Sequence, residues 1–545
     1  MRTQRLALRL ALRLACGVTA ALLASACAAT TTTAPSTAPG QAAPKGYLAE
    51  ADQSLPAGGT LNLSVHIDSG AATGYDPQLA DVATTWQLLS LSYETLVTVG
   101  PDFSVQPLLA DKWETPDPKT YVFHLRDGVT FSNGREMTAD DVVGSLKRLL
   151  ASKSVWRGQL GPVKSVTKDG DRTVKVTLSE PYTPFLAALA NIPAAVLPMK
   201  EIDDKSVDPA KTLLGTGPYV VENHRQDVSW TFKRNDKYWA KGKPAADAVN
   251  ITIAPEEAAR IAALQNGGAA LATLGNVDSA SMLAGAKNVQ VVTQATTDFY
   301  YLMLNTQAPN SKFADPRVRQ AVAIALDQQQ IADVALGGKG RPTAVTPAGL
   351  PGACDPAALP SASKSLDEAK KLLAEAGAQN LTFTLSIFST EPAPAVAQVI
   401  QQNLQQAGIT VKIEQLDEAS WSGKVYGKAP AEFDAALSWF AGYADPGMVT
   451  KWWNPETAGF NVGFMKPDKE LNALIDAANK DTEQRDKALS AVCAKADADA
   501  QMIPLVTRPA TVAFRTDALS PSLYATEGYG NVLRLIADAR VKKAQ

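Results

Sequence analysis

Histidine and cysteine are scarce in this chain of 545 residues, which has three His and four Cys. The three His, at positions 66, 124 and 224, stand far apart, whereas a metal site needs several ligands close together. The chain also lacks the H-E-x-x-H, C-x-x-C, G-x-x-x-x-G-K-[ST] and G-x-S-x-G motifs. The signatures of the common metalloproteases, P-loop proteins and serine hydrolases are therefore missing. We expect no metal, no cofactor and no enzymatic activity.

Long apolar runs are also missing beyond the first 27 residues, so the body of the chain is not predicted to span a membrane. Residues 1–26 have the pattern of a signal peptide, in which Arg at positions 2, 5, 9 and 13 precedes a short apolar stretch. Its removal takes away four Arg and no acid, which moves the formal net charge from −3 to −7. We therefore expect an exported chain that is soluble and has no nucleic-acid partner.

The end of this signal peptide, Leu23-Ala24-Ser25-Ala26-Cys27, resembles a bacterial lipobox. In a lipobox the Cys receives a lipid and becomes the new N-terminus. This predicts a lipoprotein that is anchored through Cys27 to the outer face of the cytoplasmic membrane. The same residues also fit an ordinary A-x-A cleavage site, which would give a secreted form. Residues 27–55 are rich in Thr, Ala, Pro and Ser and cannot build a core, so they predict a flexible stalk.

Two Cys remain in the body of the chain, Cys354 and Cys493. In an exported protein, an even number of Cys is paired in disulfides more often than it stays reduced. We therefore predict a disulfide between Cys354 and Cys493, although sequence alone does not bring the two sulfur atoms together.

The part of the chain after the stalk, about 490 residues, is too long for one hydrophobic core and predicts at least two lobes. Apolar residues alternate over positions 381–387 and 409–413, as in half-buried strands, and they recur at helical spacing over 396–404. Such a strand-helix-strand unit buries a sheet beneath a helix, so this lobe is predicted to be α/β. Three further helices are predicted to begin after Thr138, Asp315 and Ser365.

A series of short segments, spread over nearly the whole mature chain, shares its order and spacing with one known family. The segments are residues 75–77 (YDP), 93–96 (YETL), 107–114 (PLLADKWE), 121–149 (YVFHLRDGVTFSNGREMTADDVVGSLKRL), 215–219 (GTGPY), 234–239 (RNDKYW), 305–306 (NT) and 314–327 (ADPRVRQAVAIALD). Together they resemble the family 5 extracytoplasmic solute-binding proteins. These are the peptide/nickel-type receptors of ABC importers, which include lipoproteins that bind dipeptides and oligopeptides.

The resemblance implies an α/β, two-lobed periplasmic-binding-protein-like fold of class II, with an extra subdomain in the first lobe. The implied first lobe combines residues 56–90, 205–295 and 510–545. The inserted subdomain covers residues 91–204, and the second lobe covers residues 296–509. A ligand would be enclosed where the two lobes close about a hinge.

In the peptide-binding members of this family, a strand of the second lobe runs into a loop of the form W-x-x-D-Y-x-[DE]-P, whose first acid accepts the α-ammonium group of the peptide. Residues 439–446 read WFAGYADP here, so Gly442 stands in the place of that acid. Losing one partner of a buried charge pair typically costs about 2 to 5 kcal/mol. A peptide amine is therefore expected to bind weakly here unless another carboxylate, at Asp445 or Asp81, replaces the missing one.

Trp439, Phe440 and Asp445 can each be interpreted either as ligand contacts or as structural residues. Trp439 and Phe440 follow a strand-like stretch, and ligands gather at strand ends in α/β lobes, which favours a cleft wall for Trp439 over hydrophobic core. Asp445 precedes a Pro and can also simply set a turn. In the first lobe, residues 81–85 match a family stretch that pairs along an extended ligand. The predicted ligand-binding residues are Asp81, Ala83, Thr85, Trp439, Phe440, Ala441, Gly442, Tyr443 and Asp445.

Three functions remain open from the sequence. The first is a receptor that captures a peptide or a related amide-containing solute and delivers it to an ABC transporter permease. The second is the same fold with a non-peptide ligand, such as an oligosaccharide, a metal chelate or haem, which Gly442 supports. The third is a surface enzyme or adhesin that has kept the receptor fold, because fold does not determine function. The expected partners of this monomer are the solute, the permease and the membrane.

Overall fold

The computed structural model describes residues 47–69, 74–80, 83–276, 278–294, 296–348, 350, 352–440, 442–458, 461–480, 483–524, 533 and 535–542. The predicted signal peptide, Cys27 and most of the predicted stalk lie outside the described residues. The described residues belong to one compact unit. Among them, we find no helix with both the length and the apolar character that are needed to cross a bilayer.

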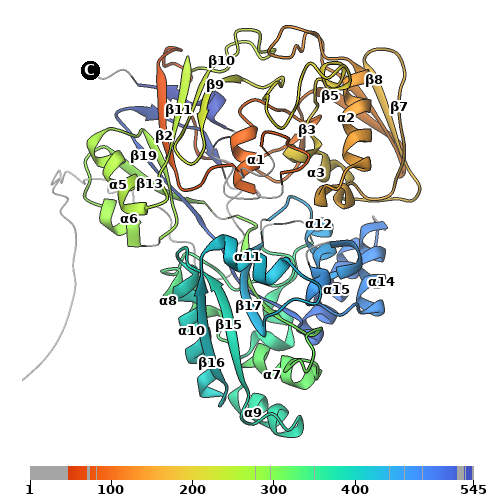
Figure 1. Ribbon diagram of the computed structural model, residues 1–545, viewed down its shortest axis with the longest axis vertical. Helices are drawn as coiled ribbons and strands as arrows, with labels where there is room; N and C mark the ends of the chain where they lie inside the picture. Colours follow the sequence, from red (N-terminus) through yellow and green to blue (C-terminus); the bar gives the residue numbers. More distant parts are fainter. Residues whose placement is uncertain are drawn as a thin grey trace, which may run out of the picture. The chain divides into compact units, whose positions relative to one another are not determined.

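A seven-stranded sheet forms the core of the first lobe (Figure 1). β2 is parallel to its neighbours β11 and β12, whereas β10 pairs antiparallel with both β9 and β11. The helix α5 (Glu257–Asn266) packs against β12. The strands, in sheet order, are β13 (Val289–Gln294), β19 (Ala510–Arg515), β12 (Leu271–Leu274), β2 (Thr60–Val65), β11 (Ala248–Ile253), β10 (Ser229–Arg234) and β9 (Tyr219–Arg225).

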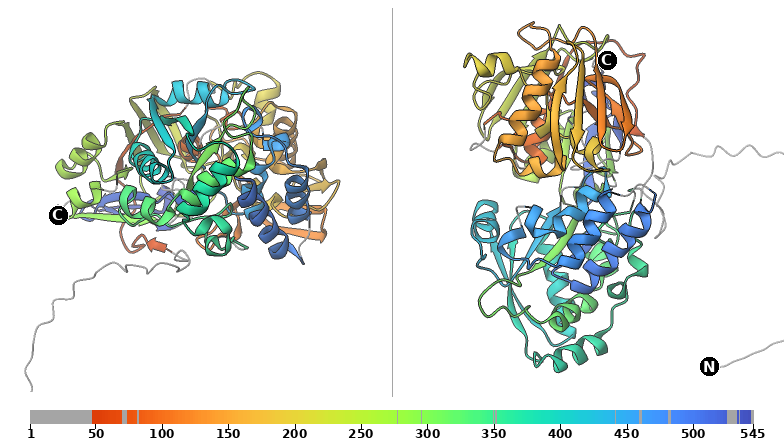
Figure 2. Two further views of the ribbon diagram at one scale, coloured as in Figure 1. Left: turned by 90° about the horizontal axis from the view of Figure 1, so that it is seen from below. Right: turned by 90° about the vertical axis from the view of Figure 1, so that its right-hand side faces the viewer.

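A four-stranded antiparallel sheet forms the inserted subdomain, which lies between β2 and β9 in the sequence. The helix α2 (Ala139–Ala151) packs against this sheet and lies beside it in Figure 2. A capping box between Thr138 and Asp141 starts the helix, which confirms the predicted start. The strands, in sheet order, are β5 (Ala110–Asp117), β6 (Thr120–Leu125), β8 (Thr173–Leu178) and β7 (Val163–Lys168).

A five-stranded mixed sheet forms the core of the second lobe. The helix α10 (Ala393–Gln406) connects the parallel strands β15 and β16, which confirms the predicted strand-helix-strand unit. The helices α7 (Pro316–Ala325) and α9 (Leu366–Glu375) begin where they were predicted to begin. The strands, in sheet order, are β16 (Thr410–Leu416), β15 (Thr382–Phe388), β17 (Ala435–Phe440), β14 (Phe299–Leu304) and β18 (Met502–Thr507).

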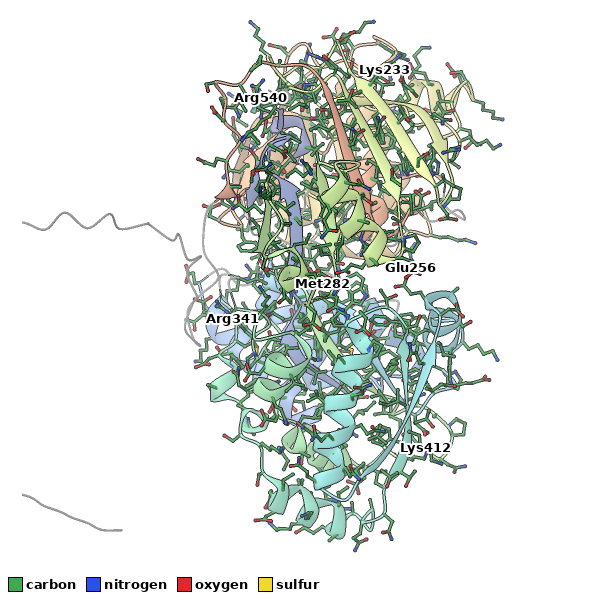
Figure 3. All side chains as sticks on the ribbon, turned by 90° about the vertical axis from the view of Figure 1, so that its left-hand side faces the viewer. Lys233, Glu256, Met282, Arg341, Lys412 and Arg540 are labelled. Atoms are coloured by element: carbon green, nitrogen blue, oxygen red, sulfur yellow. A yellow bond between two sulfur atoms is a disulfide. The ribbon has the colours of Figure 1, made fainter. Side chains whose placement is uncertain are left out.

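The remaining strands and α-helices of the described residues lie around and between these sheets. The short strands are β1 (Tyr47–Ala49), β3 (Val97–Val99), β4 (Val105–Pro107), β20 (Leu519–Ser520), β21 (Leu523–Tyr524) and β22 (Arg540–Val541). The other α-helices are α1 (Ala83–Leu89), α3 (Phe185–Leu189), α4 (Met199–Asp203), α6 (Asp278–Leu283), α8 (Gln328–Ala335), α11 (Glu418–Tyr426), α12 (Pro446–Thr450), α13 (Pro455–Ala458), α14 (Lys469–Lys480) and α15 (Arg485–Asp499). The exposed Lys233 on β10 and Lys412 on β16 mark the two large sheets in Figure 3.

The chain passes twice between the two large sheets, first from β13 to β14 and later from β18 to β19. These two crossovers are hydrogen-bonded to each other. The Arg508 N–H donates to the Asp298 carbonyl at 2.7 Å, and the Thr296 hydroxyl donates to the Arg508 carbonyl at 2.7 Å. The crossovers lie at the predicted limits of the second lobe, residues 296 and 509. The predicted domain boundaries remain a prediction, since no independent folding of the parts has been shown.

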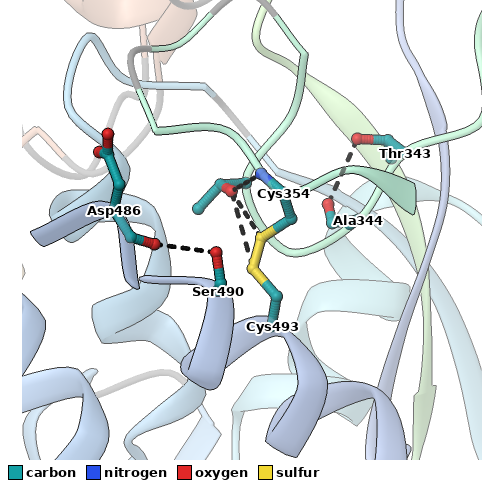
Figure 4. Close-up of a disulfide and its surroundings, with 7 residues drawn as sticks. Thr343, Ala344, Cys354, Asp486, Ser490 and Cys493 are labelled. Atoms are coloured by element: carbon teal, nitrogen blue, oxygen red, sulfur yellow. Dashed lines mark hydrogen bonds between the residues drawn. A yellow bond between two sulfur atoms is a disulfide. The ribbon is translucent and has the colours of Figure 1, made fainter. Parts of the chain in front are cut away.

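The structure joins Cys354 and Cys493 by a disulfide, with the two Cα atoms 6.3 Å apart (Figure 4). Cys493 belongs to α15, and Cys354 lies in the segment after α8. The Thr346 hydroxyl accepts the Cys354 N–H at 2.8 Å and lies against both sulfur atoms. The bridge therefore ties this segment, which has little regular structure, to a helix of the second lobe.

We expect both Cys to resist alkylation in the unreduced, denatured protein. The Cys354→Ser, Cys493→Ser double variant should unfold at a lower urea concentration, because the bridge closes a loop with a sequence separation of 139 residues. In the chain-entropy model, such a bridge is worth about 5 kcal/mol. Mass spectrometry of the alkylated protein and urea unfolding measure the two effects. Labelling of both Cys without reductant would rule out the bridge.

Candidate functional site

Three strand ends meet at one edge of the five-stranded sheet, beside the crossovers. β14 is antiparallel to both β17 and β18, so Phe299 at its start is opposite Phe440 and Thr507 at their ends. The residues just outside these strands are Asp298, the 442–446 loop and Arg508. Ligands of α/β lobes bind at such strand ends, so we place the candidate site here.

Trp439 and Phe440, adjacent on β17, have different surroundings. Trp439 is partly exposed, and the Arg508 guanidinium lies 4.5 Å above the centre of its ring. The Arg508 Nε also donates to the Tyr300 hydroxyl at 3.2 Å, so this cation is held between two aromatic residues. Phe440 is buried and packs against Phe299, with 5.3 Å between the ring centres. The geometry thus favours core packing for Phe440 and leaves Trp439 at the surface of the site.

Tyr443 links the second lobe to the other parts of the chain. Its ring meets that of Trp156, from the inserted subdomain, edge to face at 5.3 Å, and Trp156 in turn contacts Trp86 of α1 at 5.1 Å. Burial, together with the nearby Asp298 carboxylate, raises the pKa of Tyr443, so its hydroxyl stays neutral at physiological pH. These three aromatic rings form a continuous contact between the lobes.

Gly442 occupies a position that has no room for a side chain. A Cβ added to Gly442 would overlap both the hydroxyl and the backbone of Thr297. Its N–H donates to the Asp298 carboxylate at 2.8 Å. Any side chain at position 442, including that of an acid, would therefore overlap the segment between β13 and β14.

The Asp445 carboxylate is occupied by groups of its own lobe. It accepts two hydrogen bonds from the Arg485 guanidinium, one of 2.9 Å to Nη1. It also accepts the Gly447 N–H at 2.7 Å and so caps the N-terminus of α12. This arrangement favours the alternative interpretation, in which Asp445 shapes the loop.

The predicted first-lobe contacts are described only in part. Asp81, like Ala441 of the second lobe, lies outside the described residues. Ala83 is described only as the first residue of α1, and Thr85 in the same helix is buried. A role of these positions in ligand contact remains a prediction. The same holds for the other five predicted residues of the second lobe, which are Trp439, Phe440, Gly442, Tyr443 and Asp445.

Three further residues at the site were not among those predicted. Asp298 and Arg508 flank apolar strands, and a charge directly beside a strand of buried residues is the signal that could have identified them. His66 follows β2, one of the parallel strands of the first lobe. Burial and the nearby cations Arg260 and Arg508 lower the pKa of His66 to about 3, so this imidazole is neutral at physiological pH.

Polar contacts hold the inserted subdomain against the second lobe. The Lys451 ammonium donates to the Gly158 carbonyl and lies 5.2 Å from the centre of the Tyr182 ring. Burial lowers the pKa of Lys451 to about 8. Lys480 and Glu180 form an ion pair at 2.8 Å. The buried apolar core is also continuous from the subdomain into the second lobe, whereas the seven-stranded sheet has a separate core.

Metal-binding groups are not assembled in the part of the chain that the structure describes. Within these residues, no three His, Cys, Asp or Glu side chains are grouped in a way that could hold a metal ion. At the candidate site, Asp298 lies 3.8 Å from the cation Arg508, and Arg508 is near enough to His66 to contribute to its lowered pKa.

The family profile described as bacterial extracellular solute-binding proteins, family 5 Middle, matches residues 104–461. The chain belongs to this family. This confirms the family predicted from the sequence motifs, and the protein is a solute-binding protein.

Two curated relatives cover most of this solute-binding protein. The glutathione-binding protein GsiB of Salmonella typhi is 28% identical over 81% of this chain and 87% of its own length. The heme-binding protein A of Haemophilus influenzae is 27% identical over 78% of this chain and 83% of its own length. The match thus extends well beyond the region of the family profile.

Solved structures confirm the predicted fold. AgaA of A. tumefaciens R10, in complex with agropinic acid, superposes with a TM-score of 0.78 at 24% identity, covering 89% of this chain and 99% of AgaA. DppA of Helicobacter pylori, in complex with the peptide STSA, gives a TM-score of 0.76 at 24% identity, covering 90% and 99%. The two-lobed, periplasmic-binding-protein-like α/β fold is therefore that of this solute-binding protein.

The lowered pKa of His66 predicts a loss of stability in acid. The unfolded chain takes up this proton near the ordinary pKa of 6.5, but the folded protein takes it up only near 3. Stability that is present above pH 6.5 is therefore lost as the pH falls towards 3. We expect His66→Asn to lose less stability than the wild type between pH 6.5 and 4, as measured by urea unfolding.

The control for this measurement is His124→Asn, since His124 is a partly exposed residue on β6 that pairs with Glu114 at the surface. This variant should keep the acid dependence of the wild type. If His66→Asn and the wild type lose the same free energy of unfolding over this pH range, His66 does not have the role described.

Proposed function

We propose that this protein captures a peptide, or a related amide-containing solute, between its lobes and delivers it to the permease of an ABC importer. The observation that carries the proposal is the family match over residues 104–461, together with a fold similarity that covers 90% of the chain. A relative named for glutathione binding and a structural neighbour with a bound peptide support an amide-containing ligand. Trp439, which is partly exposed at a strand end, would supply an aromatic surface for such a ligand.

A non-peptide ligand is the second candidate, and Gly442 is the observation that favours it. The acid that holds the ammonium group in peptide-binding members is missing, and Thr297 fills the space that its side chain would need. One relative is named for haem binding, and one structural neighbour holds agropinic acid. An enzyme or adhesin on this fold has less support, because the matched family and these relatives are named as binding proteins.

The binding test is native mass spectrometry of the protein purified from its own host. We expect it to carry an amide-containing solute of low mass. Peptides of two to five residues should raise the melting temperature, because a ligand that binds only the folded state stabilises it by about 2.7 kcal/mol at 100 times its Kd. Haem, a nickel–histidine complex and oligosaccharides are the comparison ligands. Stabilisation by these alone would replace the peptide proposal with the second candidate, and turnover of any solute would favour an enzyme.

We further propose that the protein is a monomeric lipoprotein, anchored at the outer face of the cytoplasmic membrane through Cys27, with residues 27–55 as the stalk. The lipobox-like residues before Cys27 support the anchor, and the polar composition of the stalk supports a flexible tether. The anchor would keep the receptor close to its permease while the stalk allows the lobes to move.

Lipidation can be tested by growing cells that express the full chain with a radiolabelled fatty acid. We expect the label in the wild type and its absence in Cys27→Ala, which should be released from the membrane fraction. Cys16→Ala is the matched control, since Cys16 lies inside the apolar part of the signal peptide, and it should keep the label. Equal labelling of the Cys27→Ala variant would exclude this residue as the site of attachment.

A further inference from the structure

Trp156 is a buried residue of the inserted subdomain that contacts both segments predicted to bind the ligand. It belongs to the short 3-10 helix η1 (Val155–Leu160) and is only 1% exposed. Its ring meets the Tyr443 ring of the second-lobe loop edge to face, with 5.3 Å between the ring centres. It meets the Trp86 ring of α1 in the same manner at 5.1 Å. Trp156 is thus a shared partner of two segments that are far apart in the sequence.

On the first-lobe side, Trp86 connects this contact to the predicted ligand-binding stretch, residues 81–85. Trp86 directly follows the stretch, and its indole N–H donates to the carbonyl of Ala80, which directly precedes it, at 2.9 Å. Trp86 is partly exposed and packs against the apolar core of the seven-stranded sheet as well as the core shared by the subdomain and the second lobe. One side chain therefore holds the backbone at both ends of this stretch.

On the second-lobe side, the inserted subdomain packs along the 442–446 loop and the helix that follows it. The carbonyl of Gly158 in η1 accepts the Lys451 ammonium, so η1 contacts the chain on both sides of α12, at Tyr443 and at Lys451. Pro184 reaches α12 itself, since a Cβ added to Gly447 would lie 2.7 Å from Pro184 Cγ. The loop is therefore supported by the subdomain as well as by its own lobe.

Trp156 is itself fixed within the subdomain. Its backbone N–H donates to the Ser154 hydroxyl at 3.1 Å, which caps the start of η1. Its indole N–H donates at 3.2 Å to the carbonyl of Ala188 in α3. A close-packed ring with its N–H satisfied cannot shift without its neighbours. The ring is therefore a firm surface against which Trp86 and Tyr443 rest.

We propose that Trp156 is a positioning residue that holds α1 and the 442–446 loop in the relative arrangement that the ligand requires. This deepens the proposed function and rests on it, because a solute captured between the lobes has to contact both segments. Edge-to-face contacts favour one relative orientation of two rings, so they transmit position from one segment to the other. The inserted subdomain thereby takes part in recognition without a contact to the ligand.

The alternative role for Trp156 is packing within the core of its own subdomain, as is usual for a large buried side chain. Trp230 on β10 is a residue of that kind, and it is 0% exposed. Its indole N–H donates to the Asp68 carboxylate at 2.6 Å, and its ring stacks on Phe232, with 5.5 Å between the ring centres. These partners all belong to the first lobe. Trp230 is therefore a matched control with the same residue type, the same burial and a satisfied N–H.

The first test compares hydrogen–deuterium exchange of the ligand-free wild type with that of Trp156→Leu and Trp230→Leu. Leu keeps apolar bulk but removes the ring contacts. We expect Trp156→Leu to accelerate exchange at least about fivefold in both α1 and residues 442–450, because each lost edge-to-face pair weakens local stability by a severalfold factor. Trp230→Leu should leave exchange over 442–450 unchanged.

Trp156→Phe is the second variant, since it keeps a ring but loses the indole N–H. It should accelerate exchange in the same two segments, by a smaller factor than Trp156→Leu. Circular dichroism and thermal unfolding check that each variant is folded. Should Trp156→Leu not fold, Trp156→Phe provides the comparison with Trp230→Leu.

The second test measures the Kd of peptides of two to five residues by native mass spectrometry. The Kd should rise at least about fivefold in Trp156→Leu and stay within about twofold of the wild type in Trp230→Leu, since only the first variant loses contacts to both predicted binding segments. A purely structural role would lower the melting temperature of both variants and leave both Kd values alike.

The outcomes separate the positioning role from the proposed function. Unchanged exchange in either segment of the Trp156 variants would overturn the positioning role, and so would equal acceleration over 442–450 in Trp230→Leu. An unchanged Kd in Trp156→Leu would overturn it as well. If the wild type binds no peptide, the peptide function fails, and the exchange measurement then decides by itself whether Trp156 holds the two segments.

Discussion

The hydrogen bonds between the two crossovers are the contacts on which the rest of the site depends. They join Arg508 to Asp298 and to Thr296, so the end of β18 and the start of β14 are held together as the chain passes between the two large sheets. A shift of either crossover would change the positions of Asp298 and Arg508. It would also change the contact between Arg508 and the ring of Trp439. The two crossovers and the candidate ligand site thus share the same few residues.

Packing against these crossovers also determines what the neighbouring loop can carry. Thr297 leaves no space for a side chain at Gly442, and Asp298 binds the backbone of the same residue. From the loop, Tyr443 contacts Trp156 of the inserted subdomain. The apolar core is continuous from the inserted subdomain into the second lobe. Together with the contacts of Lys451 and Lys480, it holds the subdomain against the second lobe.

Local patterns in the sequence were reliable where a helix or strand depends on its own residues. The alternation over 381–387, the helical spacing over 396–404 and the caps at Thr138 and Asp315 all correspond to elements of the structure. Family motifs correctly predicted the fold and the solute-binding family. The sequence was less informative about roles at the site. Phe440 packs into the core and Asp445 caps a helix, although both lie within seven residues of Trp439 in the same predicted motif, residues 439–446.

By itself, the sequence determined the family, the α/β class, the order of the main elements and the absence of an acid at position 442. Each of these depends on residue type and short-range spacing. Only the tertiary structure decided that the Asp298 carboxylate accepts the Gly442 N–H, because the two positions are 144 residues apart and meet through the pairing of β14 with β17. The neutral state of His66 was decided in the same way, since its pKa depends on burial and on two Arg that are distant in the sequence.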